Sequence, residues 1–521
     1  MRMQIFSFSP FGYEGALVTV EVDIRRGIPA VDIVGLADGA VKESRERMRA
    51  AVQNSGFDFP PERVLVSLSP ADMRKEGAGF DLAIALAVLQ ARSGKDSFSD
   101  SPSVLVMGEL ELSGNVRGVR AVHAAASTAA ASGIFKCIVP LSNADEAREV
   151  HGMKVYGAAS LEDAFSALAS DEVFTERGSS LQNAFVPENC VETEGVLFPP
   201  VTEGFEFADV AGQSFFVRGL QIAAAGGHNL IAIGAPGCGK TMAQQKFHAL
   251  LPLLAVEEAQ PVTRIYSIAG LMRGNEPLIR VAPFRQPHQT ATIEGMCGGG
   301  VRCIPGEISL AHNGVLFLDE AAEFRSSVLQ MLRVPIESGR ITLARAGRST
   351  VYPASFQLLM AANPCPCGNF GSKSKICLCS ARAVETYWNK FSAPLLDRID
   401  MRVFVDNEGT GQDAARTTTA ELRMEIARAV KVQRKRQGKK NAKLLPEEIA
   451  RCCPMSADGR KSLDNAAMRC GFSPRAAASC IKLARTIADM AGCPVIQETH
   501  VKEAIRYRKA CTGFLPENAD G

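Results

Sequence analysis

Short apolar runs alternate with alanine-rich stretches over the first third of the chain. Four runs have the length and the β-branched content of strands, at residues 16–22, 63–68, 103–107 and 137–140. The stretches at 81–91 and 119–132 have the composition of helices. This alternation predicts an α/β domain over residues 1–170.

The pattern changes after residue 170. Residues 171–204 are polar, contain Gly-Ser-Ser and Pro-Pro steps and have little periodicity, so we predict a linker. Apolar strand-like runs return at 229–233 and 356–362, which predicts a second α/β domain over residues 205–405. Residues 406–521 are helix-patterned with few strand signals, and we expect a helical lid there.

Composition and charge narrow the class of protein. The 521 residues suffice for roughly three domains, and the net charge of +2 means that a surface for an anionic partner has to be local. No apolar stretch approaches the roughly 20 residues of a membrane span. We therefore expect a cytoplasmic protein without membrane contact, in which the 15 cysteines are reduced or bind metal.

A glycine-rich motif follows the apolar run at 229–233. It reads GAPGCGKT and comprises Gly234, Ala235, Pro236, Gly237, Cys238, Gly239, Lys240 and Thr241. Glycines let backbone N–H groups of such a loop face a phosphate chain, the lysine reaches the β- and γ-phosphates, and the threonine hydroxyl binds Mg²⁺. Residues 242–251 have a helical pattern, and the start of a helix there favours an anion. The motif predicts a P-loop that binds ATP and Mg²⁺.

The second half of a nucleotide site follows in the sequence LFLDE. Its apolar part predicts a buried strand that ends at Asp319, which can hold the Mg²⁺ shell, and Glu320, which can polarise the attacking water. The run at 356–362 ends at Asn363, whose amide can orient that water. A turn-forming asparagine before Pro364 is the alternative. Both halves on one chain predict an ATPase.

Two arginines are candidates for phosphate contacts. Arg398 lies among apolar residues beside Asp397 and Asp400, so it either pairs with one of them or is reserved for a phosphate. In ring-shaped ATPases such an arginine reaches into the neighbouring subunit. Arg475 is in the first turn of a predicted helix, where a positive charge opposes the helix dipole. We expect an anionic partner for it; an exposed arginine without a role is the alternative.

Some cysteines are clustered and others are scattered. Cys365, Cys367, Cys377 and Cys379 form two close pairs, and four thiolates are the ligands of tetrahedral structural Zn²⁺. A spacing of one intervening residue is rarer than two, and a reduced loop is the alternative. In the P-loop, Lys240 and oriented N–H groups could activate Cys238 for redox control. We favour the simpler interpretation, a small residue that fits a tight loop.

Further runs resemble the ComM/YifB-type magnesium-chelatase-like AAA+ ATPases over nearly the whole chain. They are GGHN at 226–229, PGEISLAHNGVLFLDE at 305–320, NPCPCG at 363–368, PLLDRID at 394–400 and ARTIAD at 484–489. The resemblance implies a P-loop AAA+ module with a C-terminal helical lid, Walker A at 234–241 and Walker B at Asp319 and Glu320. It also implies sensor 1 at Asn363, an arginine finger at Arg398 and a sensor-2 arginine at Arg475.

The resemblance extends to two insertions and to the N-terminal domain. Residues 286–304 fit an insert in helix 2, and residues 340–353 fit a hairpin before sensor 1, with Arg345, Gly347 and Arg348 near its turn. Residues 67–72 and 75–82 resemble Lon-type (S5-type) protease domains, here a ChlI-type variant. The loop at 77–81 has no serine or cysteine to act as a nucleophile, so we expect no peptidase activity.

A basic segment indicates what the ATPase could act on. Residues 431–443 carry seven positive charges, enough for several phosphate contacts, although such a run is usually a solvated helix face. With Arg345, Arg348 and the resemblance, it favours a hexameric ring that moves on single-stranded or branched DNA. The resemblance implies branch migration in recombination and natural transformation. The alternatives are a magnesium-chelatase-like ATPase that remodels a protein partner, and an ATP-gated scaffold.

Overall fold

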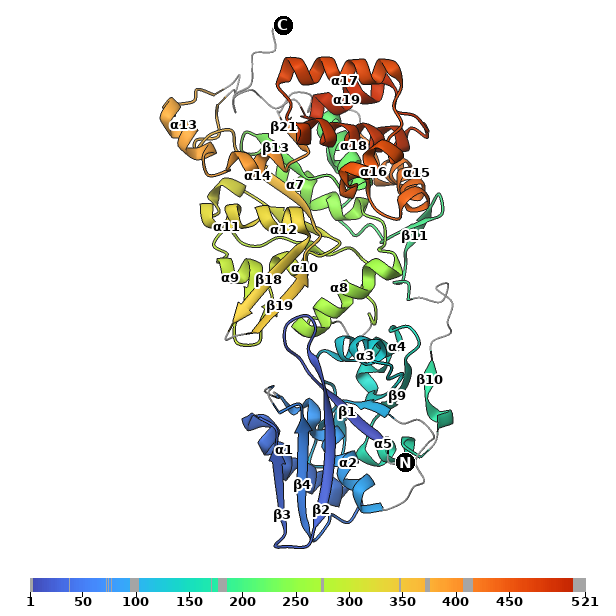
Figure 1. Ribbon diagram of the computed structural model, residues 1–521. Helices are drawn as coiled ribbons and strands as arrows, with labels where there is room; N and C mark the ends of the chain where they lie inside the picture. The colour runs from blue at the N-terminus through green and yellow to red at the C-terminus, as the bar shows by residue number, and fades with distance from the viewer. Residues whose placement is uncertain are drawn as a thin grey trace.

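The computed structural model has three parts along an elongated molecule. An N-terminal α/β unit lies at one end, a second α/β unit (the core) in the middle and a group of helices at the other end (Figure 1). The structure describes residues 3–36, 38–71, 73, 75, 77–93, 103–169, 171–176, 185–272, 276–345, 348–370, 375–405 and 416–508. The boundary expected at residue 406 lies outside these ranges.

A sheet of eight strands forms the centre of the N-terminal unit, in the order β10-β9-β8-β5-β1-β2-β4-β3. The strands are β1 (Gln4–Ser9), β2 (Ala16–Arg25), β3 (Ala30–Val34), β4 (Arg63–Ser69), β5 (Ser103–Val106), β8 (Lys136–Pro140), β9 (Lys154–Ala158) and β10 (Thr175–Glu176). The helices are α1 (Gly39–Asn54), α2 (Asp81–Ser93), α3 (Val122–Ala131), α4 (Ala144–Arg148) and α5 (Leu161–Ala167). Strand β1 pairs antiparallel with β2 and parallel with β5, so the sheet is mixed. The predicted α/β class is confirmed, and the Lon-like character of this unit stays a prediction.

The core is built on a parallel sheet in the order β14-β17-β20-β13-β21. Its strands are β13 (Leu230–Gly234), β14 (Phe284–Arg285), β17 (Val315–Leu318), β20 (Gln357–Ala362) and β21 (Met401–Val405). Its helices include α6 (Ser214–Gly226), α7 (Lys240–Gln245), α8 (Val256–Ala269), α11 (Ser326–Met331), α12 (Arg333–Ser338), α13 (Ala381–Trp388) and α14 (Ala393–Asp397). Strands β13, β17 and β20 are buried at every position, which explains their continuous apolar sequence. Because the strands are parallel, their C-terminal ends meet at one edge of the sheet.

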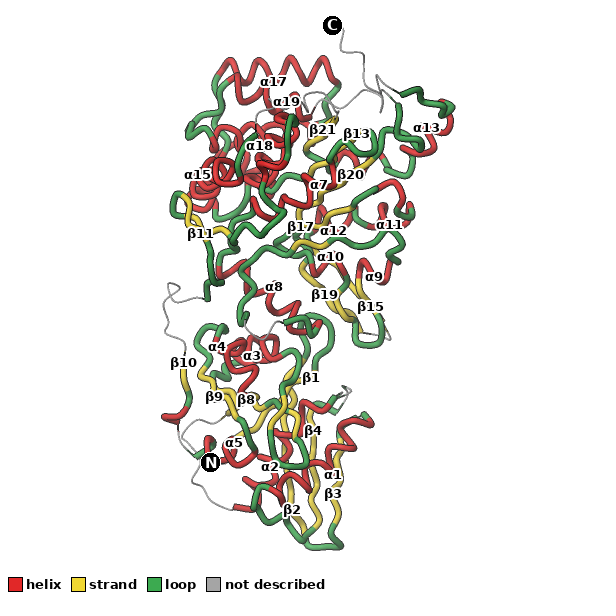
Figure 2. Tube along the Cα trace, turned by 180° about the vertical axis from the view of Figure 1, so that it is seen from behind, coloured by secondary structure: helices red, strands yellow, loops and turns green. Residues whose placement is uncertain are grey.

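Two insertions leave the core on the side that faces the N-terminal unit, where β15 and β19 lie at the same end (Figure 2). The first contains α9 (Ile293–Cys297), β15 (Gly298–Gly299) and β16 (Ile304–Pro305), and α10 (Glu307–Leu310) follows it. The second is a hairpin of β18 (Arg340–Arg345) and β19 (Arg348–Pro353), in which Arg345 pairs with Arg348. Gly347 lies outside the described residues. The buried Tyr352 hydroxyl donates to the Cys303 carbonyl at 2.9 Å, which joins the two insertions.

The C-terminal part is helical, as predicted. It contains α15 (Thr419–Gln437), α16 (Pro446–Cys452), α17 (Ala457–Cys470), α18 (Pro474–Met490) and α19 (Glu498–Arg508). Helix α15 packs on α6 and α18, so these helices share a hydrophobic core with the parallel sheet. In the part of the chain that the structure describes, none of the helices combines the length and the apolar character of a membrane span.

The expected linker is structured in part. Strands β11 (Val191–Thr193) and β12 (Val196–Phe198) form a hairpin, and Phe198 is fully buried in the core. The Arg423 guanidinium lies 5.0 Å from the Phe198 ring, and the Leu253 N–H donates to the Leu197 carbonyl at 2.8 Å. A hairpin with only three residues per strand is too short to leave a visible sequence period. Residues 177–184 lie outside the described residues.

Candidate functional site

The P-loop lies between the C-terminal end of β13 and the start of α7. Gly237 and Gly239 adopt φ angles of 80° and 83°, a region that residues with a side chain rarely occupy, so the loop requires glycine at both positions. The Lys240 ammonium donates to the Gly234 carbonyl at 2.7 Å and to the Ala235 carbonyl at 2.9 Å. The lysine thus points into the loop, where it can meet a phosphate chain.

The residues expected around Mg²⁺ and the attacking water meet at the same edge of the sheet. The Thr241 hydroxyl donates to the Asp319 carboxylate at 2.9 Å, which joins the start of α7 to the end of β17. Asn363, directly after β20, has its Oδ1 3.4 Å from the Lys240 Nζ. Glu320 has a φ of 48°, a strained conformation that occurs preferentially at functional sites. The structure therefore brings together the Walker and sensor-1 candidates of the sequence.

Gln289 is a polar neighbour of this site that sequence reasoning missed. Its amide donates to the Glu320 carboxylate at 2.5 Å. The residue follows β14, the edge strand beside β17, and so reaches the same end of the sheet. The signal was a polar residue shortly after a strand, but a strand of two residues is too short to be recognised. Gln289 can hold the carboxylate of Glu320 in place.

Arg398 lies at the opposite end of the strands, before the N-terminal end of β21. It precedes β21, whose first residue, Met401, pairs with Leu230 at the start of β13. The P-loop begins where β13 ends, and five residues of strand span about 16 Å. The bonds of Arg398 run to the Pro394 carbonyl, at 2.6 Å, and to the Glu337 carboxylate. Arg398 is therefore remote from the P-loop of its own chain.

Arg475 lies beside Arg398. It is the second residue of α18, and its Nη1 donates to the other oxygen of Glu337 at 3.1 Å. Its Nε is also 3.8 Å from Asp397. The hydrogen bond from Arg398, with both positive charges nearby, lowers the pKa of Glu337. The expected anionic partner of Arg475 is therefore present in the structure.

A buried network joins α18 to this edge of the sheet and contains the GGHN and PLLDRID runs. The Asp400 carboxylate accepts from the Asn229 N–H at 3.0 Å and from the Ser479 hydroxyl, and it lies 3.7 Å from His228 Nδ1. Burial acts to raise the pKa of Asp400, but His228 and Ser479 outweigh it and hold the pKa at about 2. The Asn229 amide donates to the Arg398 carbonyl at 3.1 Å. These runs thus fix the backbone of Arg398.

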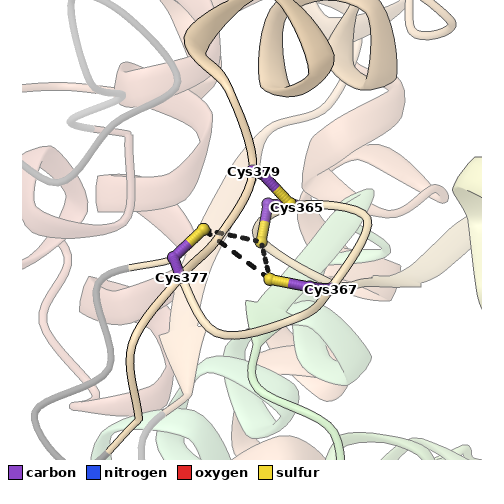
Figure 3. A group of neighbouring side chains, drawn as sticks. All are labelled: Cys365, Cys367, Cys377 and Cys379. Carbon is purple, nitrogen blue, oxygen red and sulfur yellow. Dashed lines mark hydrogen bonds between the residues drawn. The ribbon is translucent and has the colours of Figure 1, made fainter.

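The four clustered cysteines converge on one point (Figure 3). The sulfur of Cys365 is 3.4 Å from that of Cys367 and 3.7 Å from that of Cys377, and all four sulfurs lie within 4.8 Å of one another. A tetrahedral Zn²⁺ with bonds of about 2.3 Å separates its sulfurs by about 3.8 Å. The Asn369 N–H and the neighbouring thiols lower the pKa of Cys367 to about 6, whereas hydrogen bonds with Cys367 raise the pKa values of Cys377 and Cys379. The donor set therefore fits a structural zinc ion.

The cysteine loop also touches the P-loop. A Cβ added to Gly368 would lie 2.4 Å from the Pro236 ring, and the φ of Gly368 is 76°. The Trp388 indole donates to the Pro364 carbonyl at 3.0 Å and anchors the start of the loop. Because Asn363 immediately precedes this segment, the cysteine cluster lies next to both a candidate catalytic residue and the phosphate loop.

Cys238 is enclosed within the P-loop. It is 3% exposed, and its sulfur is 3.6 Å from the Lys240 Nζ. A Cβ on Gly234 would lie 2.9 Å from that sulfur, so the space around it is filled. This packing supports the interpretation of a small residue that fits a tight loop.

The basic segment at 431–443 is not a continuous phosphate-binding surface. Internal contacts hold most of its cations: Arg434 to the Leu253 carbonyl, Arg436 to the Asp489 carboxylate, Lys439 to the Glu448 carboxylate and Lys443 to the Phe356 carbonyl. Burial lowers the pKa of Lys443 to about 8. The segment spans the end of α15 and the turn after it, so its charges face the core as well as solvent. The nucleic-acid interpretation of this run therefore loses its main support.

Three family models match successive parts of the chain. They describe magnesium chelatase subunit ChlI over residues 206–412, subunit ChlI of Mg-chelatase over 20–143, and its C-terminal part over 416–508. A protein of Escherichia coli named YifB, described as uncharacterised, is 38% identical over 502 residues, which is 95% of each chain. Competence protein ComM of Haemophilus influenzae is 36% identical over 513 residues, 97% of each chain.

The likeness to a magnesium-chelatase 38 kDa subunit is more limited. The subunit of Acidiphilium rubrum is 27% identical over 184 residues, 31% of this chain and 53% of its own. Full-length similarity, three family models in series and the P-loop geometry agree with the sequence motifs. The chain belongs to the ComM/YifB-type magnesium-chelatase-like AAA+ family.

Proposed function

We propose that this protein is an ATP-hydrolysing ring motor that acts on DNA. One observation supports a ring-shaped assembly. The residues suited to bind ATP and Mg²⁺ lie at the C-terminal ends of the core strands, while Arg398 and Arg475 lie at the opposite ends. An arginine finger that stabilises the charge of the transition state has to touch the γ-phosphate. In a closed ring the arginine edge of each subunit faces the nucleotide edge of the next, so the site is completed by a neighbour.

Within this proposal each residue has a defined task. Lys240 contacts the β- and γ-phosphates, Thr241 and Asp319 hold Mg²⁺, and Glu320 polarises the attacking water with help from Asn363. The bound Mg²⁺ neutralises charge on the phosphates. Gln289 restrains Glu320 until substrate is correctly placed.

The DNA substrate is supported by two observations. ComM of Haemophilus influenzae is named as a competence protein, and the relationship extends over 97% of both chains. The hairpin of β18 and β19 projects from the core and carries the exposed Arg345 beside its turn. Six such hairpins around a ring would present arginines to the phosphate backbone in a central channel. Branch migration of recombining strands is the reaction we propose.

A chelatase-like role is the second candidate. The family models are named after a magnesium-chelatase subunit, but the full-length relatives include YifB and ComM. In this role the ring would remodel a protein partner, and DNA would have no effect on hydrolysis.

Measurement of the ATPase rate with and without DNA separates the candidates. We expect single-stranded and four-way-junction DNA to stimulate hydrolysis, with junction unwinding that requires ATP. Glu320→Gln should reduce the rate about 10²-fold or more while nucleotide still binds. Hydrolysis without DNA stimulation or strand displacement would refute the DNA motor and favour the protein-remodelling role.

A further inference from the structure

Glu337 is an exposed carboxylate that holds both candidate phosphate-contacting arginines. It lies near the end of α12, and one oxygen accepts from Arg398 while the other accepts from Arg475 at 3.1 Å. The two arginines come from the end of α14 and the start of α18, which are far apart in sequence. Two guanidinium groups this close would repel each other without an intervening negative charge. Asp397 lies near Arg475, but Glu337 is the carboxylate that contacts both guanidinium groups.

Stability alone does not explain this arrangement. The Glu337 side chain is 55% exposed and that of Arg475 is 41% exposed, whereas that of Arg398 is 12% exposed. Ion pairs with an exposed partner contribute little to folding stability. The two oxygens of Glu337 also accept hydrogen bonds from two different elements. This arrangement orients the two arginines more than it stabilises the fold.

Both arginines keep donors for an additional anion. A guanidinium has five N–H groups, and Arg398 uses Nη1 on the Pro394 carbonyl and Nη2 on Glu337. The Nε of Arg398 is buried and, among the described residues, has no hydrogen-bond partner. Because this Nε is enclosed by protein, an incoming phosphate would meet the Nη groups instead. Each Nη group has a second N–H that a phosphate oxygen of an incoming nucleotide can accept from.

We propose that Glu337 is a positioning residue for ATP hydrolysis at the neighbouring subunit's site. Its carboxylate holds Arg398 and Arg475 as a pair, so that both guanidinium groups meet the phosphates bound by the next protomer. The inference rests on the proposed function, because it needs hydrolysis between subunits. Since α12 leads directly into β18, Glu337 also links the arginine pair to the hairpin proposed to contact DNA.

Steady-state kinetics of Glu337→Gln test the role. The variant keeps the shape but loses the charge, and misplacement of an arginine finger by about 1 Å costs about 10²-fold in rate. We expect kcat to fall at least about tenfold, with Glu337→Asp between the two. Affinity for a fluorescent ATP analogue should fall less than kcat, because Glu337 is remote from the P-loop and acts on the nucleotide only through the two arginines. Asp464→Asn, an exposed acid on α17, is the matched control and should behave as wild type.

Mixed rings establish where Glu337 acts. Lys240→Ala subunits cannot use their own nucleotide site but present an intact arginine edge, whereas Glu337→Gln subunits have the reverse defect. Mixing them should therefore raise the ATPase rate above that of either variant alone. No gain on mixing would place Glu337 in its own site and overturn the inference. An unchanged kcat for Glu337→Gln would also overturn the inference. A higher kcat would overturn it too, because Glu337 would then hold the arginines back from the phosphates.

Two different outcomes refute the proposed function and the positioning role. A wild-type chain that does not hydrolyse ATP refutes the proposed function and this inference with it. A wild-type chain that hydrolyses ATP, combined with a fully active Glu337→Gln, refutes only the positioning role.

Discussion

The packing of Cys238 predicts that its thiol is inert. The thiol is buried in the P-loop, where the phosphate-facing groups are backbone N–H groups rather than side chains. We expect Cys238→Ala to retain kcat within about twofold, equivalent to about 0.4 kcal/mol in activation free energy. Peroxide treatment followed by ATPase assay checks this, because the variant and the wild type should lose activity equally. Protection by the substitution would instead assign a redox role to Cys238.

Some polar residues of the candidate site could be predicted from the sequence, and others could not. Lys240, Thr241 and Asp319 could be predicted because glycine spacing and an apolar strand mark them. Glu337 and Gln289 could not, since each acts through a side chain brought close only by the fold. A single carboxylate on a short helix carries no spacing signal.

The cysteine loop allows a direct test of the predicted Zn²⁺ site. We expect about one Zn²⁺ per chain after dialysis, measured by elemental analysis, and loss of the metal in Cys379→Ser. Since the loop packs on Pro236 and follows Asn363, metal loss should also lower kcat, by up to about 10²-fold. Cys470→Ser, on α17 and outside the cluster, is the control and should keep its zinc. Metal-free wild-type protein with full activity would contradict the prediction.

Among whole elements, the sequence predicted buried strands better than charged helices. Strands β13, β17 and β20 are recognisable because a strand buried on both faces is uniformly apolar. The basic run at the end of α15 suggested a nucleic-acid surface, but α16 and α18 cover part of it and pair its cations. Charge composition does not reveal which neighbour a side chain will meet.

At the scale of the whole molecule, the N-terminal unit contacts both insertions of the core. The loop between β1 and β2 reaches the hairpin, where the Tyr13 N–H donates to the Thr350 hydroxyl at 2.9 Å. The Arg264 guanidinium of α8 lies 4.8 Å from the Tyr13 ring. The Gly12 N–H donates to the Arg302 carbonyl of the first insertion at 3.3 Å. The N-terminal unit therefore contacts both the turn of the first insertion and the hairpin proposed to face DNA.

Substitution of Gly12 tests whether this contact matters for DNA use. A Cβ there would lie 2.2 Å from the Thr350 hydroxyl oxygen, and the φ of 57° adds backbone strain of about 1–2 kcal/mol. Gly56→Ala is the matched control, because Gly56 has a φ of 79° but nothing within 4 Å of the position that a Cβ would take. Both variants carry the strain, but only Gly12→Ala displaces the hairpin. We expect Gly12→Ala alone to lose DNA stimulation of the ATPase and to exchange the amide hydrogens of β19 faster, while basal hydrolysis persists because the nucleotide edge is untouched. Equal behaviour of the two variants would mean that the N-terminal unit does not govern the hairpin.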